Sequence, residues 1–278
     1  MADSQPTAES RGASAEDVPM TIFEHLGELR SRLIKAVLGT LPGMAVAWAY
    51  KEYLLDFLLA PYARAWQNLK LGIGAPKIHF GGLIDPFSVY MKLSIICGII
   101  FASPWMFYQA WAFIAPGLYK TEKRYALPFV LASSVFFIGG AFFGYAMVFP
   151  PAFETFLSLS GTLPSAQVSV EPTIMLNDYM ELATQMLIAF GVVFEVPVVV
   201  TFLALVGLVN YKQLFRFGRW FVVIASIIAA ILTPPDVASQ MMMMVPLVTL
   251  YFLSVGIAYF LGPKPPPDPE RDPEPGAG

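Results

Sequence analysis

The stretch PFVLASSVFFIGGAFFGYAMVF, residues 128–149, decides the fold, because it runs for 22 residues without a charged side chain. An α-helix rises about 1.5 Å per residue, so a helix of this length crosses the roughly 30 Å hydrocarbon core of a bilayer. Proline suits the first turn of a helix, where its missing N–H would have no partner in any case. The stretch therefore predicts a transmembrane helix.

Five further apolar runs flank this stretch and predict five further spans. On the N-terminal side lie residues 33–50 and residues 86 to about 115, where Pro104 predicts a kink. On the C-terminal side lie residues 178–207, 220–232 and 237–261. We therefore predict an all-α, polytopic membrane protein with six transmembrane helices.

The last two predicted helices form a short hairpin. Residues 220–232 give only about 20 Å of helix, which is less than the hydrocarbon core of a bilayer. Thr233, Pro234, Pro235 and Asp236 follow at once and end the run. We expect the polar tip of this hairpin to lie below the outer surface of the membrane.

Composition supports a chain that lies mostly in lipid. Hydrophobic residues make up 56% of the sequence and charged residues 13%, against about 25% charged in soluble domains. A net charge of −3 gives no reason to expect a nucleic-acid partner. Residues 1–19 are polar and lack the apolar segment of a signal peptide, and residues 263–278 alternate proline with charge. Both are predicted to be disordered cytoplasmic tails around a membrane domain at residues 20–262.

Two connections are predicted to be external loops, and the charge distribution sets the orientation. Residues 51–85 and 150–177 are more polar and contain prolines, with an interfacial helix over residues 53–60 left open. With both termini inside, twelve Lys and Arg residues fall inside and five fall outside. Cytoplasmic segments carry the excess of positive charge, so both termini are predicted to be cytoplasmic.

Several kinds of chemistry find no support in the sequence. There is no GxxxxGK phosphate loop and no HExxH metal motif, and the two histidines, His25 and His79, lie outside the predicted spans. The single cysteine, Cys97, cannot form an intrachain disulfide. We therefore expect no catalysis, no cofactor and no metal. The function classes that remain are a transporter, a channel and a membrane scaffold.

Glu195 lies near the middle of the fourth predicted span, far from any Lys or Arg at the same depth. An acidic residue there costs at least about 2.5–3.5 kcal/mol, so it needs a partner or a purpose. It either bonds, protonated, to a carbonyl freed by Pro197, or it offers a polar contact to a partner helix or cargo. Gly140 and Gly144 likewise either pack against a helix of the same chain, which we favour, or mediate dimerisation.

Four segments resemble the TatC family of the twin-arginine protein translocase, in order and at the predicted helix boundaries. They are HLGELRSRL (25–33), WAFIAPGLYKTEKR (111–124), FEVP (194–197) and LTPPDVASQ (232–240), with DPFSVYMKL (85–93) as a weaker fifth. The resemblance covers residues 20–261. It implies a receptor in the bacterial inner membrane for the twin-arginine signal peptides of folded proteins. It also implies proton-gradient-driven export and assembly, in homo- and hetero-oligomers, with single-span TatA- and TatB-type subunits.

The resemblance places the signal-peptide site on two segments, with Glu24, Glu28, Arg30 and Glu122 as its residues. From the residues alone, Glu28 pairs with Arg32 one helical turn later, and Glu122 balances the basic residues beside it. On the functional interpretation, the carboxylates of Glu28 and Glu122 bind the two guanidinium groups of the signal peptide, since each Arg bonds both carboxylate oxygens.

The hairpin tip also has two interpretations. Asp236 suits a helix N-cap after Pro234 and Pro235, and Gln240 can be satisfied locally. The resemblance adds a role for Gln240 and the tip in docking partner subunits. The alternative function is a proton-coupled secondary transporter of small solutes that uses Glu195, although the two halves of the chain share no evident repeat.

Overall fold

The computed structural model describes residues 22–69, 75–114, 126–162, 169–170, 172–233 and 237–262. The helices of these residues are α1 (Ile22–Ala49), α2 (Lys51–Leu69), α3 (Asp85–Ile114), α4 (Ala126–Phe143), the π-helical turn η3 (Gly144–Val148), α5 (Phe149–Ser158), α6 (Leu176–Phe194), α7 (Val196–Leu205), α8 (Tyr211–Leu232) and α9 (Val237–Leu261). Two short strand pairs accompany them. β1 (Ile78–His79) runs parallel to β4 (Ile174–Met175), and β2 (Gly161–Thr162) runs antiparallel to β3 (Ser169–Val170).

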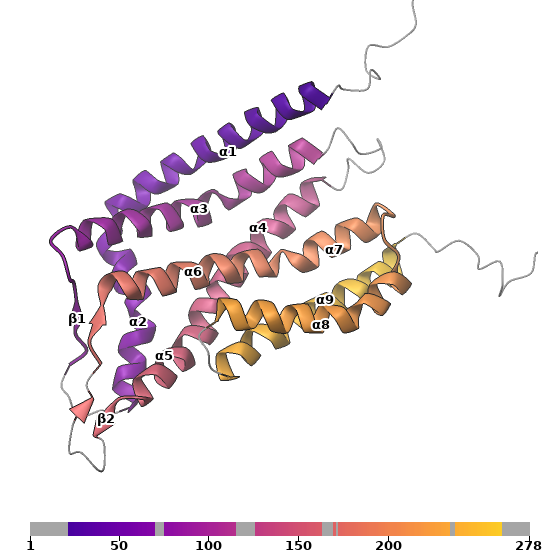
Figure 1. Ribbon diagram of the computed structural model, residues 1–278. Coiled ribbons are helices and arrows are strands. Elements are labelled where there is room, and N and C mark those ends of the chain that lie inside the picture. The colour runs from indigo at the N-terminus through magenta and orange to yellow at the C-terminus, as the bar shows by residue number, and fades with distance from the viewer. Residues whose placement is uncertain are drawn as a thin grey trace, which may run out of the picture.

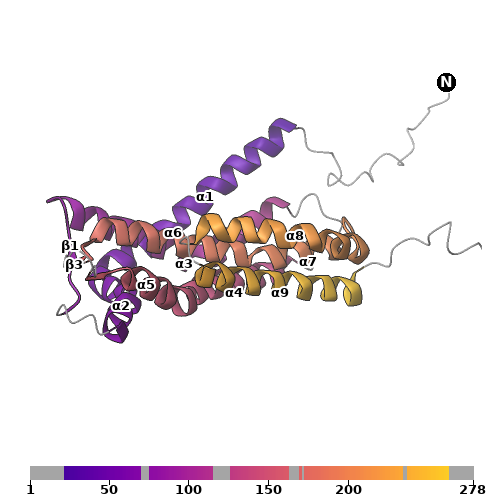
Figure 2. The same cartoon turned by 60° about the horizontal axis from the view of Figure 1, so that its bottom comes forward.

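The predicted six-span, all-helical fold is confirmed. Five stretches of the described chain are long and apolar enough to cross a membrane, and α1 with α2, bent by 81° at their junction, makes a sixth when the pair is counted as one span. Figure 1 shows the long helices side by side and α2 across one end of the bundle. Figure 2 shows α1 inclined to the rest of the bundle, although its first turn stays stacked on the last turn of α3 through His25 and Phe113.

The bundle has two ends, which we name by their helices. At the α1 end, α1, α4 and α8 begin and α3, α7 and α9 finish (Figure 1). At the α2 end lie α2, α5, the two strand pairs and the first residues of α3 and α6. Functional groups are located below by these two ends.

Glycines let α1 and α3 approach closely. A Cβ on Gly98 would lie 2.4 Å from Met44 Cγ, and one on Gly39 would lie 2.1 Å from Cδ1 of Trp105. The Trp105 indole also donates a hydrogen bond of 2.9 Å to the carbonyl oxygen of Lys35. Small residues at such contacts allow the dispersion forces that hold helices together in lipid.

Gly140 and Gly144 serve packing within the chain, as we favoured. A Cβ on Gly140 would lie 2.6 Å from the carbonyl oxygen of Phe190, and one on Gly144 would lie 2.6 Å from Cδ2 of the same residue. The two glycines therefore form the contact surface of the third span for α6.

The prediction of an external loop over residues 51–85 was wrong for its first half. Residues 51–69 form a complete helix, α2, which is longer than the interfacial helix left open over residues 53–60. Its buried side chains are Leu58, Pro61, Tyr62, Ala65 and Trp66. They recur at helical spacing, so α2 is an amphipathic helix whose apolar stripe packs on the bundle.

The predicted start of the second loop at residue 150 was also wrong. The third span continues to Ser158, because the π-helical turn η3 passes directly into α5. In η3 the N–H of Phe149 donates to the carbonyl oxygen of Gly144, five residues earlier. Pro150 and Pro151 then occupy the first turn of α5. The buried Phe153 and Leu157 follow in α5.

Two helices begin before the apolar runs that predicted their spans. α1 begins at Ile22 and α8 at Tyr211, so the basic residues that precede these runs lie within helices. The apolar part of α8 is short, as predicted, although the helix itself has 22 residues. The α8–α9 hairpin ends well short of the α2 end in both views (Figures 1 and 2). Its tip residues Pro234, Pro235 and Asp236, like the tails, lie outside the described residues.

Side chains satisfy backbone carbonyls that prolines leave without a donor. Pro61 has no N–H for the carbonyl oxygen of Phe57, which instead accepts a 2.7 Å hydrogen bond from the Tyr145 hydroxyl. Pro104 likewise has no N–H for the carbonyl oxygen of Ile100, which accepts a hydrogen bond of 2.8 Å from the Ser103 hydroxyl. α3 therefore continues through Pro104 as one helix.

The contact between α4 and α6 predicts different responses at two adjacent glycines. Gly140→Ala forces a methyl group against Phe190 and Phe194, and overpacking of this kind costs about 1–3 kcal/mol. Gly139→Ala is the matched control, since a Cβ there meets nothing within 4 Å. We expect thermal unfolding of the purified protein in detergent to show a lower midpoint for Gly140→Ala and an unchanged or higher one for Gly139→Ala. Equal midpoints would contradict the close approach of α4 to α6.

Candidate functional site

Polar side chains gather at the α1 end, where the first helix begins next to the last turns of α3. Arg32 bonds Oε1 of Glu28 at 3.3 Å, one turn earlier on α1, which confirms the ion pair predicted from the sequence. Arg32 also donates to the side-chain oxygen of Gln109 on α3 at 3.4 Å. Gln109 is only 3% exposed, so it anchors the arginine to the packed face of α3.

Both hydrogen bonds from Arg32 to Glu28 end on the same carboxylate oxygen, Oε1. Within the described residues, the contacts of Glu28 leave its second oxygen, Oε2, for another donor. The Glu28 side chain keeps 21% of its surface exposed. A half-buried carboxylate with one oxygen held and one available is suited to bind a further cationic group.

The other predicted residues of this segment take different positions. Glu24 lies one turn before Glu28 on α1, so the two share a helix face. Arg30 is exposed, and because residues two apart do not face each other on a helix, it lies away from Glu28. His25 stacks on Phe113 of α3 with ring centroids 4.5 Å apart, which fixes the start of α1 on the end of α3. Glu122 lies outside the described residues.

Charge differs between the two ends of the bundle. The described part of the α1 end has six cationic and two acidic side chains: Arg30, Arg32, Lys35, Lys212, Arg216, Arg219, Glu24 and Glu28. The described part of the α2 end has four cationic and six acidic side chains: Lys51, Arg64, Lys77, Lys92, Glu52, Asp56, Asp85, Glu154, Asp178 and Glu181. Glu24 and Glu28 are thus the acidic exceptions at a positively charged end.

Glu195 lies at the junction of α6 and α7, inside the span Leu176–Leu205. Pro197 in the first turn of α7 separates the two helices. The Glu195 side chain is half-buried, and its Oε1 has no hydrogen-bond partner among the described residues. Ser133 of α4 bonds the carboxyl group through its side chain. The carboxyl group is therefore partly satisfied within the chain, by a hydroxyl and not by the backbone carbonyl of the first of the two interpretations. Its other oxygen, Oε1, is buried without a hydrogen-bond partner among the described residues.

Gln240 is satisfied within the hairpin. Its side-chain nitrogen donates to the carbonyl oxygen of Ser226 at 3.2 Å, which links α9 to α8. The Thr233 hydroxyl donates to the carbonyl oxygen of Ala229 at 2.7 Å and closes the last turn of α8. These bonds agree with the interpretation that Gln240 is satisfied within the chain. The Gln240 bond joins the two helices of the hairpin near its tip.

Sequence reasoning missed Gln109 and Ser133, the two side chains that hold Arg32 and Glu195. Each was visible as a polar residue inside an otherwise apolar run, yet nothing in the sequence paired it with its partner. Among the residues that the structure describes, no three His, Cys, Asp or Glu side chains lie close enough together to hold a metal ion.

Proteins of one known family match this chain along almost its whole length. The family model described as Sec-independent protein translocase protein (TatC) matches residues 24–246. The TatC protein of Desulforapulum autotrophicum is 41% identical over 258 residues, 93% of this chain and 91% of its own length. That of Koribacter versatilis is 37% identical over 88% of this chain and 87% of its own.

Two crystal structures of the twin-arginine translocase receptor TatC share the fold. The one in DDM superimposes with a TM-score of 0.70 at 34% identity and covers 86% of this chain and 100% of its own. The second gives a TM-score of 0.68 at 33% identity over 85% of this chain and 99% of its own.

The partial exposure of the Glu28–Arg32 pair predicts that it adds little to stability. Pairs of this kind contribute about 0.2–1 kcal/mol, because water screens their attraction. We expect Glu28→Gln to change the free energy of unfolding by less than about 1 kcal/mol, and Arg32→Gln to cost more because it also leaves Gln109 without its donor. Chemical unfolding of the purified variants measures both, and a larger loss for Glu28→Gln than for Arg32→Gln would contradict this assignment.

Proposed function

The chain belongs to the TatC family and is the multispanning core of the twin-arginine, or Sec-independent, protein translocase; from this premise we propose that carboxylates at its α1 end bind twin-arginine signal peptides. The chain is a multi-pass membrane protein that works in protein transport as part of a Tat complex. The alternative, a small-solute transporter, finds no support in these relatives.

The observation that carries the proposal is the state of Glu28. Arg32 holds one of its oxygens, and the buried Gln109 holds Arg32, so the carboxylate is fixed in position before any peptide arrives. The second oxygen faces no donor among the described residues and can accept one N–H of an incoming guanidinium group. Glu24 on the same face, and Glu122 on the segment that follows α3, extend the site toward a second arginine. Arg30 leaves α1 on a different face from Glu28, and on this proposal its positive charge orients the peptide by repulsion.

The charge asymmetry supports a cytoplasmic location for this end. Lys and Arg gather on the cytoplasmic side of membrane proteins, and the α1 end has the positive excess within the part of the chain that the structure describes. Both termini then lie in the cytoplasm of a bacterial cell, and the protein lies in the inner membrane. A signal peptide reaches the site from the side on which precursors are made.

Glu195 supports a second contact, with a single-span partner of the TatA or TatB type. Its buried Oε1 lacks a hydrogen-bond partner in the described chain, and such a group in hydrocarbon is costly until a partner supplies one. A polar side chain on a partner helix would satisfy it. Gln240 and the tip residues Pro234, Pro235 and Asp236 offer further contacts at the hairpin. On this proposal the chain positions its partners without catalysis or cofactor, and the proton gradient supplies the energy.

The signal-peptide site predicts a strong effect of charge reversal. Glu28→Lys and Glu122→Lys place a like charge against the two arginines, so we expect the double variant to bind a twin-arginine precursor at least about tenfold more weakly. Binding of a labelled signal peptide to the purified protein measures the effect. A precursor with both arginines replaced by lysine should bind the wild type weakly as well, because Lys lacks the guanidinium fork.

Glu52→Lys is the control, since Glu52 is an exposed acidic residue in the first turn of α2 at the opposite end. It should leave precursor binding unchanged and should not alter the amount of protein in the membrane. Normal binding by the Glu28→Lys, Glu122→Lys variant at normal abundance would remove these carboxylates from the site.

The hydrogen-bonding role of Glu195 predicts that glutamine can replace it in large part. Glutamine keeps a donor and an acceptor, whereas alanine removes both and leaves the Ser133 hydroxyl without its bond. We expect Glu195→Gln to retain most export of a folded twin-arginine reporter and Glu195→Ala to lose export and co-purification of partner subunits. Both should be normalised to protein abundance. An inactive glutamine variant at normal abundance would favour a titrating group instead.

A further inference from the structure

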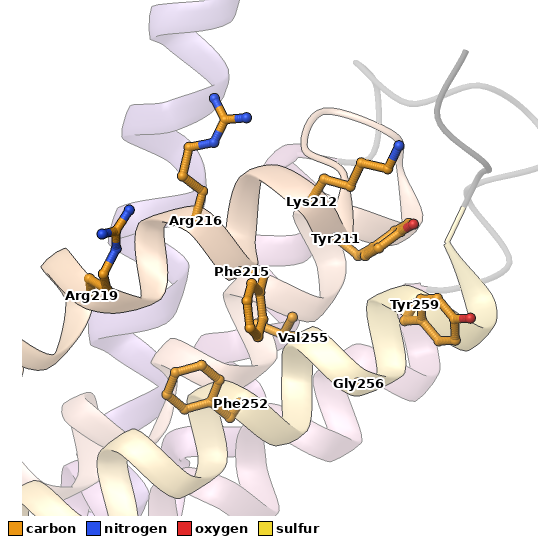
Figure 3. Close-up of a pocket in the computed structure, with 9 residues that line it drawn as sticks. All are labelled: Tyr211, Lys212, Phe215, Arg216, Arg219, Phe252, Val255, Gly256 and Tyr259. Carbon is orange, nitrogen blue, oxygen red and sulfur yellow. The ribbon is translucent and has the colours of Figure 1, made fainter. Parts of the chain in front are cut away.

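A groove of about 1000 Å³ runs along α8 and α9 at the α1 end. Its apolar lining includes Phe215 of α8 with Phe252 and Val255 of α9. Phe215 is 68% exposed, so the groove is open at the surface of the bundle. Figure 3 shows the rings of Phe215 and Phe252 together between the two helices.

Three cationic side chains form one rim of this groove. Lys212, Arg216 and Arg219 follow one another at spacings of four and three residues on α8, so they share one face of the helix. All three are exposed, and Figure 3 shows them leaving α8 on the same side. Neither α8 nor α9 contains an acidic residue, and no ion pair to these cations occurs within the described ranges.

Aromatic residues mark the level of the membrane surface at the end of the groove. Tyr211 and Tyr259 face each other edge to face with ring centroids 4.9 Å apart, next to Lys212. Tyrosine is enriched at the membrane–water interface, at the level of the lipid headgroups. Arg216 and Arg219 lie five and eight residues further along α8, directly before the apolar run that begins at Trp220. The cations therefore lie between the tyrosine pair and the apolar part of the helix.

We propose that this groove binds a phospholipid with an anionic headgroup. The phosphate lies between the guanidinium groups of Arg216 and Arg219, with Lys212 at the outer edge of the headgroup, and an acyl chain lies along Phe215, Phe252 and Val255. Basic grooves between transmembrane helices on the cytoplasmic side suit this ligand, because they pair a charged rim with an apolar floor. This assignment is independent of the signal-peptide site.

Lipid fits the groove better than the acidic C-terminal segment of the same chain. Residues 263–278 contain four acidic residues that could reach the cations, but no side chain larger than proline among their apolar residues. They could therefore pair with the rim but not fill the aromatic lining. A phospholipid satisfies both.

Gly256 leaves the floor of the groove open. A Cβ at this position would meet nothing within 4 Å, although Phe252 and Tyr259 of the same helix line the groove on either side. A larger side chain here would occupy the path of the acyl chain without disturbing the packing of α8 on α9. Gly256→Leu therefore tests the apolar half of the site, and substitutions at Arg216 and Arg219 test the charged half.

The experiment is native mass spectrometry of the full-length protein in detergent, titrated with phosphatidylglycerol and, separately, with phosphatidylcholine. We expect the wild type to bind phosphatidylglycerol more tightly. Arg216→Gln and Arg219→Gln should each weaken that binding about five-fold, and together about 25-fold, since each cation near the headgroup contributes on the order of a five-fold factor. Arg216→Lys with Arg219→Lys should keep most of the preference. Gly256→Leu should weaken binding of both lipids.

Matched controls separate the site from general effects. Arg64→Gln with Lys92→Gln removes two cations at the α2 end, and Gly139→Leu enlarges another glycine whose Cβ meets nothing within 4 Å. Neither should change lipid binding. Size-exclusion profiles and unfolding midpoints should match the wild type for every variant that is compared.

Four outcomes would overturn the proposal. One is an equal affinity of the wild type for the two lipids. Another is a preference that persists when both arginines are glutamine, or that the control variants lose equally. The third is a headgroup preference that arises only after deletion of residues 263–278, which would identify the acidic segment as the natural occupant of the groove. Loss of a co-purified single-span partner from Gly256→Leu, with lipid binding unchanged, would identify a partner helix instead and would likewise reject lipid.

Discussion

The hydrocarbon core of a membrane offers no hydrogen-bond partners, so each backbone N–H and C=O inside it must be satisfied by the protein. This constraint shapes the structure wherever a proline or a break interrupts a helix. Tyr145 reaches across to the carbonyl oxygen that Pro61 leaves free in α2, and Ser103 does the same beside Pro104 in α3. Irregular backbone is thus tolerated where a neighbouring side chain supplies the missing bond.

The same constraint explains which polar side chains the bundle admits. Gln109 and Ser133 lie on packed faces, and each holds a charged or acidic group, Arg32 and Glu195 respectively. Each pair joins two different helices, so a residue that would be costly alone becomes a link between elements. Arg32 and Glu195 are therefore positioned by partners that are themselves almost fully buried.

The sequence predicted the spans because length and apolarity are local properties, and uninterrupted runs such as residues 128–149 carry them without ambiguity. It predicted the Glu28–Arg32 pair because one-turn spacing is local as well. The length of α2 was missed because that helix is amphipathic, and a search for apolar runs overlooks a stripe such as Leu58, Tyr62 and Trp66. The partners Gln109 and Ser133 could not be assigned, since a contact between residues 77 or 62 positions apart depends on how the helices pack. Single-residue features such as the π-helical turn also left no clear mark in the sequence.

That turn, η3, has a consequence for how the third span could change during evolution. Its bond from Phe149 to Gly144 encloses one residue more than an α-helical bond, so it acts as a one-residue insertion absorbed inside a continuous helix. Each residue of an α-helix adds about 100° of rotation, so a surplus residue in regular helix would turn everything that follows by that angle. The wider turn of η3 takes up the surplus, and α5 keeps the orientation in which Phe153 meets the rings of Tyr62 and Tyr179 at centroid distances of 6.3 and 5.3 Å. Deleting one residue between Gly144 and Val148 would therefore remove the wide turn and leave α5 facing the same way. A deletion in the regular turns between Phe149 and Phe153 has no such reserve and would rotate Phe153 off the two tyrosines, so length changes should be tolerated at η3 and rare in α5.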